Sequence, residues 1–533
     1  MNERTDAAGI GLSLDQIPEI LEPMPVMELG TRVTAPARLL HDVLHVGAPD
    51  AAIKPLGRAG AEAAYQDKRM VAFFNPVSGE SSVFPLLESL KPARGLKEAA
   101  QRAAAGLAHD TSLFPKDETR VVPLDTVTLA GARHHRDGRR DAPAEHLAYV
   151  RFQREVQGKP VFGPGTRAMA AFGGDGVLHG LTHRWRSANP VGLRLPARSR
   201  TDIADAIRAQ LAAGAKTARV TVDTVKLAYY DGGGRFLQPV YQFAATLTFR
   251  NRELHAANRR VVGYVPLSEE LEPLPVIGRQ TGPSPSEPRS GSLRGHEERS
   301  LPPGDPTVGR YVVRNDNQGW VDSANGFYAS LMLANLFGSP IPFTNAQYYW
   351  AEPFEFLSDK DAFVNNVNIA LTEVHGNWGL FSTRDNHDDL VHLRDIPAGG
   401  YGSTLAYWIL HSCEVIPTAT DETTSFDVWW NIFQGMHAAV GYRTEMWIND
   451  GVTSPFGLYL GLGVPVVSAW FSSIASNDLY GANDATYFDG NRGITEPMGR
   501  ASAIAVCGHG DDTATDLGSL GPASCLTEWW FNN

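Results

Sequence analysis

The stretch from Val367 to Ile416 contains two apolar runs, each of which ends close to a reactive side chain. The first run, residues 367–376, reads VNIALTEVHG, and the second, residues 405–414, reads LAYWILHSCE. Short apolar runs that are rich in β-branched and aromatic residues are typical of buried strands. In an open α/β sheet, ligands bind at the carboxyl ends of the strands. We therefore expect His375 and Cys413 to lie at the same edge of a sheet.

The residue types at these two strand ends indicate nucleophilic chemistry. The separation of His375 from Cys413 is too long for one helix face and suits neighbouring parallel strands joined by a crossover. An imidazole takes the thiol proton or stabilises the thiolate, so the two residues suffice for catalysis. Because Gly376 has no Cβ, a substrate carbonyl can approach closely, and we expect the amides of Gly376 and Cys413 to form an oxyanion hole. The alternative is a structural role, since a cysteine in an apolar setting often behaves as a small hydrophobe.

An apolar strand that ends in His-Gly, followed by an apolar strand that ends in Ser-Cys, resembles the caspase, legumain and gingipain superfamily of cysteine peptidases. The resemblance covers roughly Tyr311 to Trp470. It implies an α/β domain with a mostly parallel sheet flanked by helices, and a catalytic dyad of His375 and Cys413. The implied function is that of a cysteine endopeptidase without cofactor or metal. No Gln-Ala-Cys-x-Gly pentapeptide occurs, so the aspartate specificity of caspases is not implied.

Two other functions stay open on the same pair of residues. A catalytically inactive protein of this fold would act as a binding module for another protein. A peptide ligase or cyclase would use the same dyad, because an amine can resolve an acyl-enzyme as water does. Rapid alkylation of Cys413 by a thiol reagent would separate the catalytic functions from the binding module.

Composition restricts the class of protein. With 533 residues, 43% of them hydrophobic, the chain has material for two to four domains with packed cores. The formal net charge of −12 argues against a general nucleic-acid binder, so we expect protein or peptide substrates as partners. No run approaches the roughly eighteen apolar residues of a membrane span. Residues 1–28 show no secretory signal, and the localisation stays open.

The pattern along the chain divides it into four regions. Residues 1–140 give mixed helix and strand signals, and residues 141–271 indicate an α+β domain with antiparallel strands. Residues 272–309 are rich in proline, serine, glycine and arginine, which predicts an exposed, disordered linker. Residues 310–533 form the expected C-terminal α/β domain.

Two phrases in the second region carry a further resemblance. GKPVFG at residues 158–163 and LQPVY at residues 237–241 are similar to the prosegments of thermolysin-type and fungalysin-type proteases, with their PepSY-like halves. This resemblance implies an N-terminal domain that masks the active site, a zymogen activated by cleavage in the linker, and a secreted protein. The alternative is an ordinary accessory domain.

The remaining cysteines and histidines give weaker signals. Cys507 and Cys525 lie near each other in the sequence and are suited to pair, which would leave Cys413 as a thiol. His387 and His392 flank two aspartates but do not have the i, i+4 spacing of a helical zinc site. We therefore expect no metal.

Overall fold

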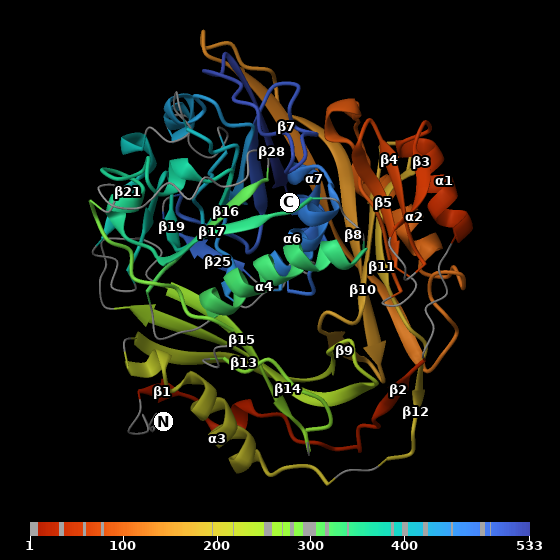
Figure 1. Cartoon of the computed structure of the whole chain (residues 1–533). Coiled ribbons are helices and arrows are strands. Elements are labelled where there is room, and N and C mark those ends of the chain that lie inside the picture. Colours follow the sequence, from red (N-terminus) through yellow and green to blue (C-terminus); the bar gives the residue numbers. More distant parts are fainter. Residues whose placement is uncertain are drawn as a thin grey trace.

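A network of hydrogen-bonded strands dominates the chain, as the computed structural model shows (Figure 1). Strands account for 40% of the structure and helices for 21%. Among the described residues, one sheet contains 23 strands, and two small sheets contain three and two. The structure describes residues 9–30, 37–56, 60–75, 79–193, 196–216, 218–249, 258–268, 270–277, 282–291, 305–314, 319–337, 341–384, 389–396, 403–418, 425–448, 451–479, 486–490 and 492–532.

The C-terminal part of the large sheet is parallel and contains both strands expected from the apolar runs. β18 and β22 pair in parallel, as predicted, and β16 lies on the other side of β18. The order across this part is β17 (Thr344–Trp350), β16 (Thr307–Val312), β18 (Ile369–Glu373), β22 (Tyr407–His411) and β23 (Ala438–Tyr442).

Beyond β23 the same sheet continues as antiparallel strands into the N-terminal region. β28 (Cys525–Asn532) pairs with β7 (Thr119–His135) from Cys525↔His135 to Asn532↔Thr128. From β7 to the last strand at this edge of the sheet, every strand is antiparallel to its neighbours. From β23 the order is β27 (Ala501–Val506), β28, β7, β8 (Ala144–Val156), β10 (Arg167–Phe172), β11 (Leu178–Arg184), β6 (Glu80–Val83), β5 (Arg69–Asn75), β4 (Ala61–Gln66) and β3 (Ala52–Leu56).

The expected separate, mostly parallel, helix-flanked domain is therefore wrong. The sheet is large and mixed, and its parallel strands share a ladder with N-terminal antiparallel strands. Helices also fail to flank the strands evenly. On one face of β22, Trp408 contacts Phe356 and Phe381, which lie in a loop and a short strand. A strand's apolar pattern reports burial, but it does not report what covers each face.

A second, mostly antiparallel layer forms the lower part of Figure 1 and is linked to the first by β9 (Lys159–Phe162), which pairs antiparallel with β8 and parallel with β13. The two strands on either side of Gly232–Gly234 form a hairpin through one long antiparallel pairing. The layer contains β13 (Ala218–Asp231), β14 (Phe236–Phe249), β15 (Asn258–Pro266), β1 (Ile10–Gly11), β2 (Met27–Leu29), β12 (Ala188–Pro190) and β24 (Trp447–Ile448).

The helices pack on these sheets through apolar faces. The Phe327 and Phe456 rings, on α4 and α6, stack 6.0 Å apart. On α7, Trp470 donates its indole N–H to the carbonyl oxygen of Gly441 in β23, over 2.9 Å. The helices are α1 (Ala37–Gly47), α2 (Leu96–Leu107), α3 (Arg200–Leu211), α4 (Gly319–Leu333), α5 (Trp429–Ile432), α6 (Thr453–Leu462) and α7 (Val466–Ala475).

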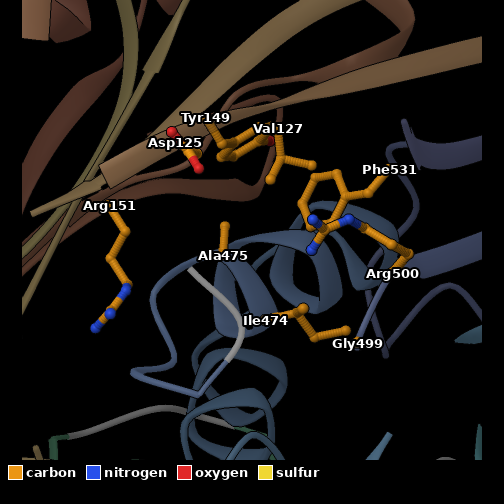
Figure 2. A pocket seen from close by; sticks show the side chains of 9 residues that line it. All are labelled: Asp125, Val127, Tyr149, Arg151, Ile474, Ala475, Gly499, Arg500 and Phe531. Carbon is orange, nitrogen blue, oxygen red and sulfur yellow. The ribbon is translucent and has the colours of Figure 1, made fainter. Parts of the chain in front are cut away.

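The N-terminal and C-terminal regions share one hydrophobic core. Tyr149 of β8 contacts Phe531 of β28, with ring centroids 5.3 Å apart, and Phe84 contacts Tyr459 of α6 at 4.7 Å. Figure 2 shows the junction of β7, β8, α7 and β28 around Tyr149 and Phe531. The cavity left there is about 10 Å³, which suits at most one water molecule. It is too small for a substrate.

Parts of the expected linker, residues 272–309, make ordered contacts. Leu274 and Ile277 are buried. The Ser286 amide donates to the Tyr348 carbonyl, and the Trp350 amide donates to the Ser286 carbonyl, so this segment lies along β17. Residues 278–281 and 292–304 are outside the described residues. In the described part of the chain, every helix is too short or too polar to cross a bilayer.

Candidate functional site

The pairing of β18 with β22 determines how the two candidate catalytic residues lie. The pairs run from Ile369↔Tyr407 to Glu373↔His411, always with the same offset in sequence. His375 and Cys413 share this offset and follow two positions after the last pair. The strand ends stay in contact, because a Cβ added to Gly376 would overlap the carbonyl oxygen of Cys413 and the hydroxyl of Ser412. His375 and Cys413 thus belong to the same edge, as the sequence predicted.

His375 is the first residue of β19 (His375–Asn377), which forms a small antiparallel sheet with β20 (Leu380–Ser382) and β21 (Leu390–His392). Its exposed fraction is 9%. The indole of Trp320, near the start of α4, meets the His375 ring edge to face with centroids 5.7 Å apart. This contact restricts rotation of the imidazole.

Cys413 keeps its thiol and is partly exposed, whereas Cys507 and Cys525 form a disulfide, as their spacing suggested. The backbone N–H of Met446 points to Cys413 Sγ over 3.4 Å. A donated N–H favours a thiolate over a thiol, because the negative charge accepts the stronger hydrogen bond. Access and a donor to sulfur are the two properties that a nucleophilic cysteine needs.

A buried acid–imidazole pair that sequence reasoning missed lies directly behind the candidate dyad. Nδ1 of His411 is 2.6 Å from Glu373 Oε2, and the two side chains are 1% and 0% exposed. Each residue precedes one member of the candidate dyad by two positions. Trp320 contacts His411 as well as His375, at 6.0 Å between ring centroids. The offset that this pair shares with the candidate dyad was the signal that could have identified it.

A second group of buried acids adjoins Cys413. Glu414 has a φ of 51°, in the left-handed region that few non-glycine residues adopt. Burial raises the pKa of Glu414 to about 8 and that of Glu445 also to about 8. The hydroxyl of Tyr487 lies 2.6 Å from Glu414 Oε1 and 2.8 Å from Glu496 Oε1. A hydroxyl has one proton to donate, so a protonated Glu414 completes the second bond.

The hairpin of β25 (Thr486–Asp489) and β26 (Ile494–Pro497) brings this acidic group to the histidine side of the site. Arg492 in its turn forms ion pairs with Asp489 and Glu496. The same guanidinium lies 5.8 Å from the ring of Trp378, which follows β19. The hairpin therefore borders both strand ends.

The close approach of Gly376 to Cys413 gives a packing reason for glycine at this position. The oxyanion hole that we expected from the amides of Gly376 and Cys413 stays a prediction. Among the sequence-based metal candidates, His387 lies outside the described residues. His392 is the last residue of β21, which belongs to the same small sheet as His375.

Comparisons with known proteins give a family resemblance without a function. The profile of a family described as "Domain of unknown function (DUF6345)" matches residues 308–491, which include His375 and Cys413. No curated protein matches the chain. A solved structure of an uncharacterized protein from Eubacterium rectale ATCC 33656 is similar over 46% of this chain and 84% of that chain, with 8% identity and a TM-score of 0.27.

Proposed function

We propose that this protein is a cysteine peptidase in which Cys413 is the nucleophile and His375 the general base. The observation that carries the proposal is the parallel pairing of β18 with β22. Its constant offset, together with the packing of Gly376 on the Cys413 backbone, brings a partly exposed thiol and an imidazole to one sheet edge.

The reaction follows from these two side chains. His375 accepts the proton of Cys413, and the thiolate attacks the carbonyl carbon of a peptide bond. When the C–N bond breaks, the imidazolium donates that proton to the leaving amine, which leaves a thioester on Cys413. A water molecule, deprotonated by His375, then attacks the thioester and releases the acid and the thiol. An amine in place of water would give ligation.

The surroundings support the first step, in which the thiolate forms beside the imidazole. The Met446 amide stabilises charge on sulfur. Trp320 holds the His375 ring from one side. The Glu373–His411 pair is buried and hydrogen-bonded. It therefore holds the ends of β18 and β22 in a fixed relative position.

Alkylation of the full-length protein with iodoacetamide near pH 7, read by mass spectrometry, tests the nucleophile. We expect Cys413 to be labelled quickly in the native protein and at least about tenfold more slowly in His375→Gln, because the imidazole promotes the thiolate. His392→Gln is the matched control and should be labelled like the wild type. Equal labelling rates in all three proteins would reject His375 as the base.

Turnover is tested separately with a mixture of unstructured peptides. We expect thiol-dependent cleavage by the wild type and on the order of a thousandfold less by Cys413→Ser, because a hydroxyl is a far weaker nucleophile at this pH. A wild type that is labelled at Cys413 but cleaves nothing would favour the inactive binding module. A joined product in the presence of an added amine would favour the ligase.

A further inference from the structure

Two histidines and an aspartate meet at the opposite end of the parallel strands from Cys413. His437 directly precedes β23, while His509 and Asp512 lie between β27 and β28. Nδ1 of His437 is 2.6 Å, and Nδ1 of His509 is 2.7 Å, from the same Asp512 oxygen, Oδ2. Because Tyr407 pairs with Ala438, the extended path from Tyr407 to Cys413, about 20 Å, separates this group from Cys413.

The hydrogen bonds of His437 determine where its ring carries hydrogen. Nε2 lies 2.6 Å from the carbonyl oxygen of Gly518, which can only accept, so Nε2 is the donor. A neutral His437 then presents the Nδ1 lone pair to Asp512 Oδ2, and two lone pairs at that distance repel each other. A cation belongs between them, either an additional proton or a metal ion.

We propose that His437, His509 and Asp512 bind one divalent metal ion, for which zinc is the best match. The candidate ligand atoms of all three residues lie within 4.8 Å of one another. Two imidazole nitrogens and one carboxylate oxygen are a zinc ligand set, with bonds of roughly 2.0–2.2 Å. The hydrogen bond from His437 Nε2 to the Gly518 carbonyl oxygen is of the kind that orients the ring of a metal-binding histidine and leaves its other nitrogen for the ion. The side chain of His509 is 35% exposed, so water can complete the fourth position.

The segment that carries two of the ligands is held in place before any ion binds. The Cys507–Cys525 disulfide closes its base. The carboxylate of Asp511 accepts the amides of Leu87 and Glu88 in the N-terminal region, at 2.7 and 3.1 Å. The backbone of this segment is therefore preorganised, which favours affinity, although an ion requires the ligand atoms to move apart from their hydrogen-bond distances of 2.6 and 2.7 Å.

The same segment joins three parts of the fold, and this indicates what the ion does. The Asp512 carbonyl accepts the Val466 amide at the start of α7. The guanidinium of Arg69, in β5, lies 3.8 Å from Asp512 Oδ1. An ion that binds His437 and this segment would lock the N-terminal strands, α7 and β23 together. The site is structural and independent of the proposed peptidase activity.

Zinc titration of the full-length protein, after treatment with a chelator, tests the proposal. We expect one zinc ion per chain by calorimetry, and a higher unfolding temperature with zinc than without. His509→Ala and Asp512→Asn should bind zinc on the order of a hundredfold more weakly, since even outer-shell changes cost tenfold or more. His392→Gln lies outside the group and should bind like the wild type.

Cobalt supplies a readout that does not depend on stability. We expect Co²⁺ in the wild type to give the intense visible absorption of a low-coordinate site, and in His509→Ala only the weak spectrum of the aqueous ion. Because His509 is partly exposed, its variant should fold, which circular dichroism checks. Zinc binding of equal strength in the wild type and His509→Ala, or no binding in the wild type, would overturn the proposal and leave a protonated histidine–aspartate pair.

Discussion

Replacement of Glu414 by glutamine should change how the stability of this protein depends on pH. Burial raises the pKa of Glu414 from the ordinary 4.5 to about 8, so the folded state binds a proton that the unfolded state has lost. Stability from this group is therefore greatest below pH 4.5 and falls as the pH rises towards 8. Glutamine has nearly the same shape, cannot ionise, and can still donate to the Tyr487 hydroxyl.

The size of the effect follows from the two pKa values. Each pH unit between them is worth about 1.4 kcal/mol, and the slope flattens as the pH approaches 8. From pH 6 to pH 8 the wild type should lose about 2 kcal/mol of unfolding free energy that Glu414→Gln keeps. Glu445, whose pKa burial also raises to about 8, adds a slope of its own to both proteins; because its charge also raises the pKa of Glu414, the comparison measures Glu414 together with this coupling.

Urea unfolding of the two proteins at pH 5, 6, 7 and 8 measures this difference. Glu98→Gln, at an exposed position on α2, is the control for the loss of a carboxylate. Its unfolding free energy should change with pH as that of the wild type does. If Glu414→Gln also runs parallel to the wild type between pH 6 and 8, Glu414 is ionised in the folded protein and the reasoning is refuted.

Three further predictions concern the same strand ends and the junction of the two regions. Gly376→Ala should lower the unfolding free energy by about 1–3 kcal/mol, because its Cβ overlaps the Cys413 backbone; unchanged urea stability would show that the glycine serves something other than close approach. Glu373→Gln should cost about 1–3 kcal/mol, because it disturbs a buried hydrogen bond, and a double-mutant cycle with His411→Phe should recover part of this cost, whereas strict additivity would mean that the pair does not interact. A cut within residues 292–304 should leave both fragments in one peak on size exclusion, because β7 and β28 stay paired; separate peaks would instead favour a releasable prosegment.

The local structure of much of this chain could be predicted from the sequence, because it depends on neighbouring residues. The helix with Ile203, Ile207 and Leu211 on one face is present as α3, and all three are buried. Its N-cap is Ser199, whose hydroxyl accepts the Asp202 amide. The spacing of the apolar residues predicts the helix, but the capping residue depends on a hydrogen bond that other polar residues nearby could also have made.

The candidate site was predictable in part for the same reason. The order His375, Gly376, Cys413 at the ends of two apolar runs was enough to bring them to one edge, and the register of β18 and β22 agrees with it. The Glu373–His411 pair was not recognised, although it has the same sequence offset as His375 and Cys413, because only the register of β18 and β22 shows that the two side chains meet. Tyr487 and Glu414, which share a hydrogen bond, come from segments that are far apart in the sequence.

What only the tertiary structure decided is the long-range pairing. The sequence by itself determined that the two apolar runs are neighbouring parallel strands and that the thiol and the imidazole follow their ends. It could not show that β28 pairs with β7 in the N-terminal region, which joins strands of the three expected domains in one mixed sheet. Nor could it bring His437 to His509 and Asp512. Backbone hydrogen bonds along a strand edge are the same for any sequence, so the partner of an edge strand is selected by the packing of the whole core.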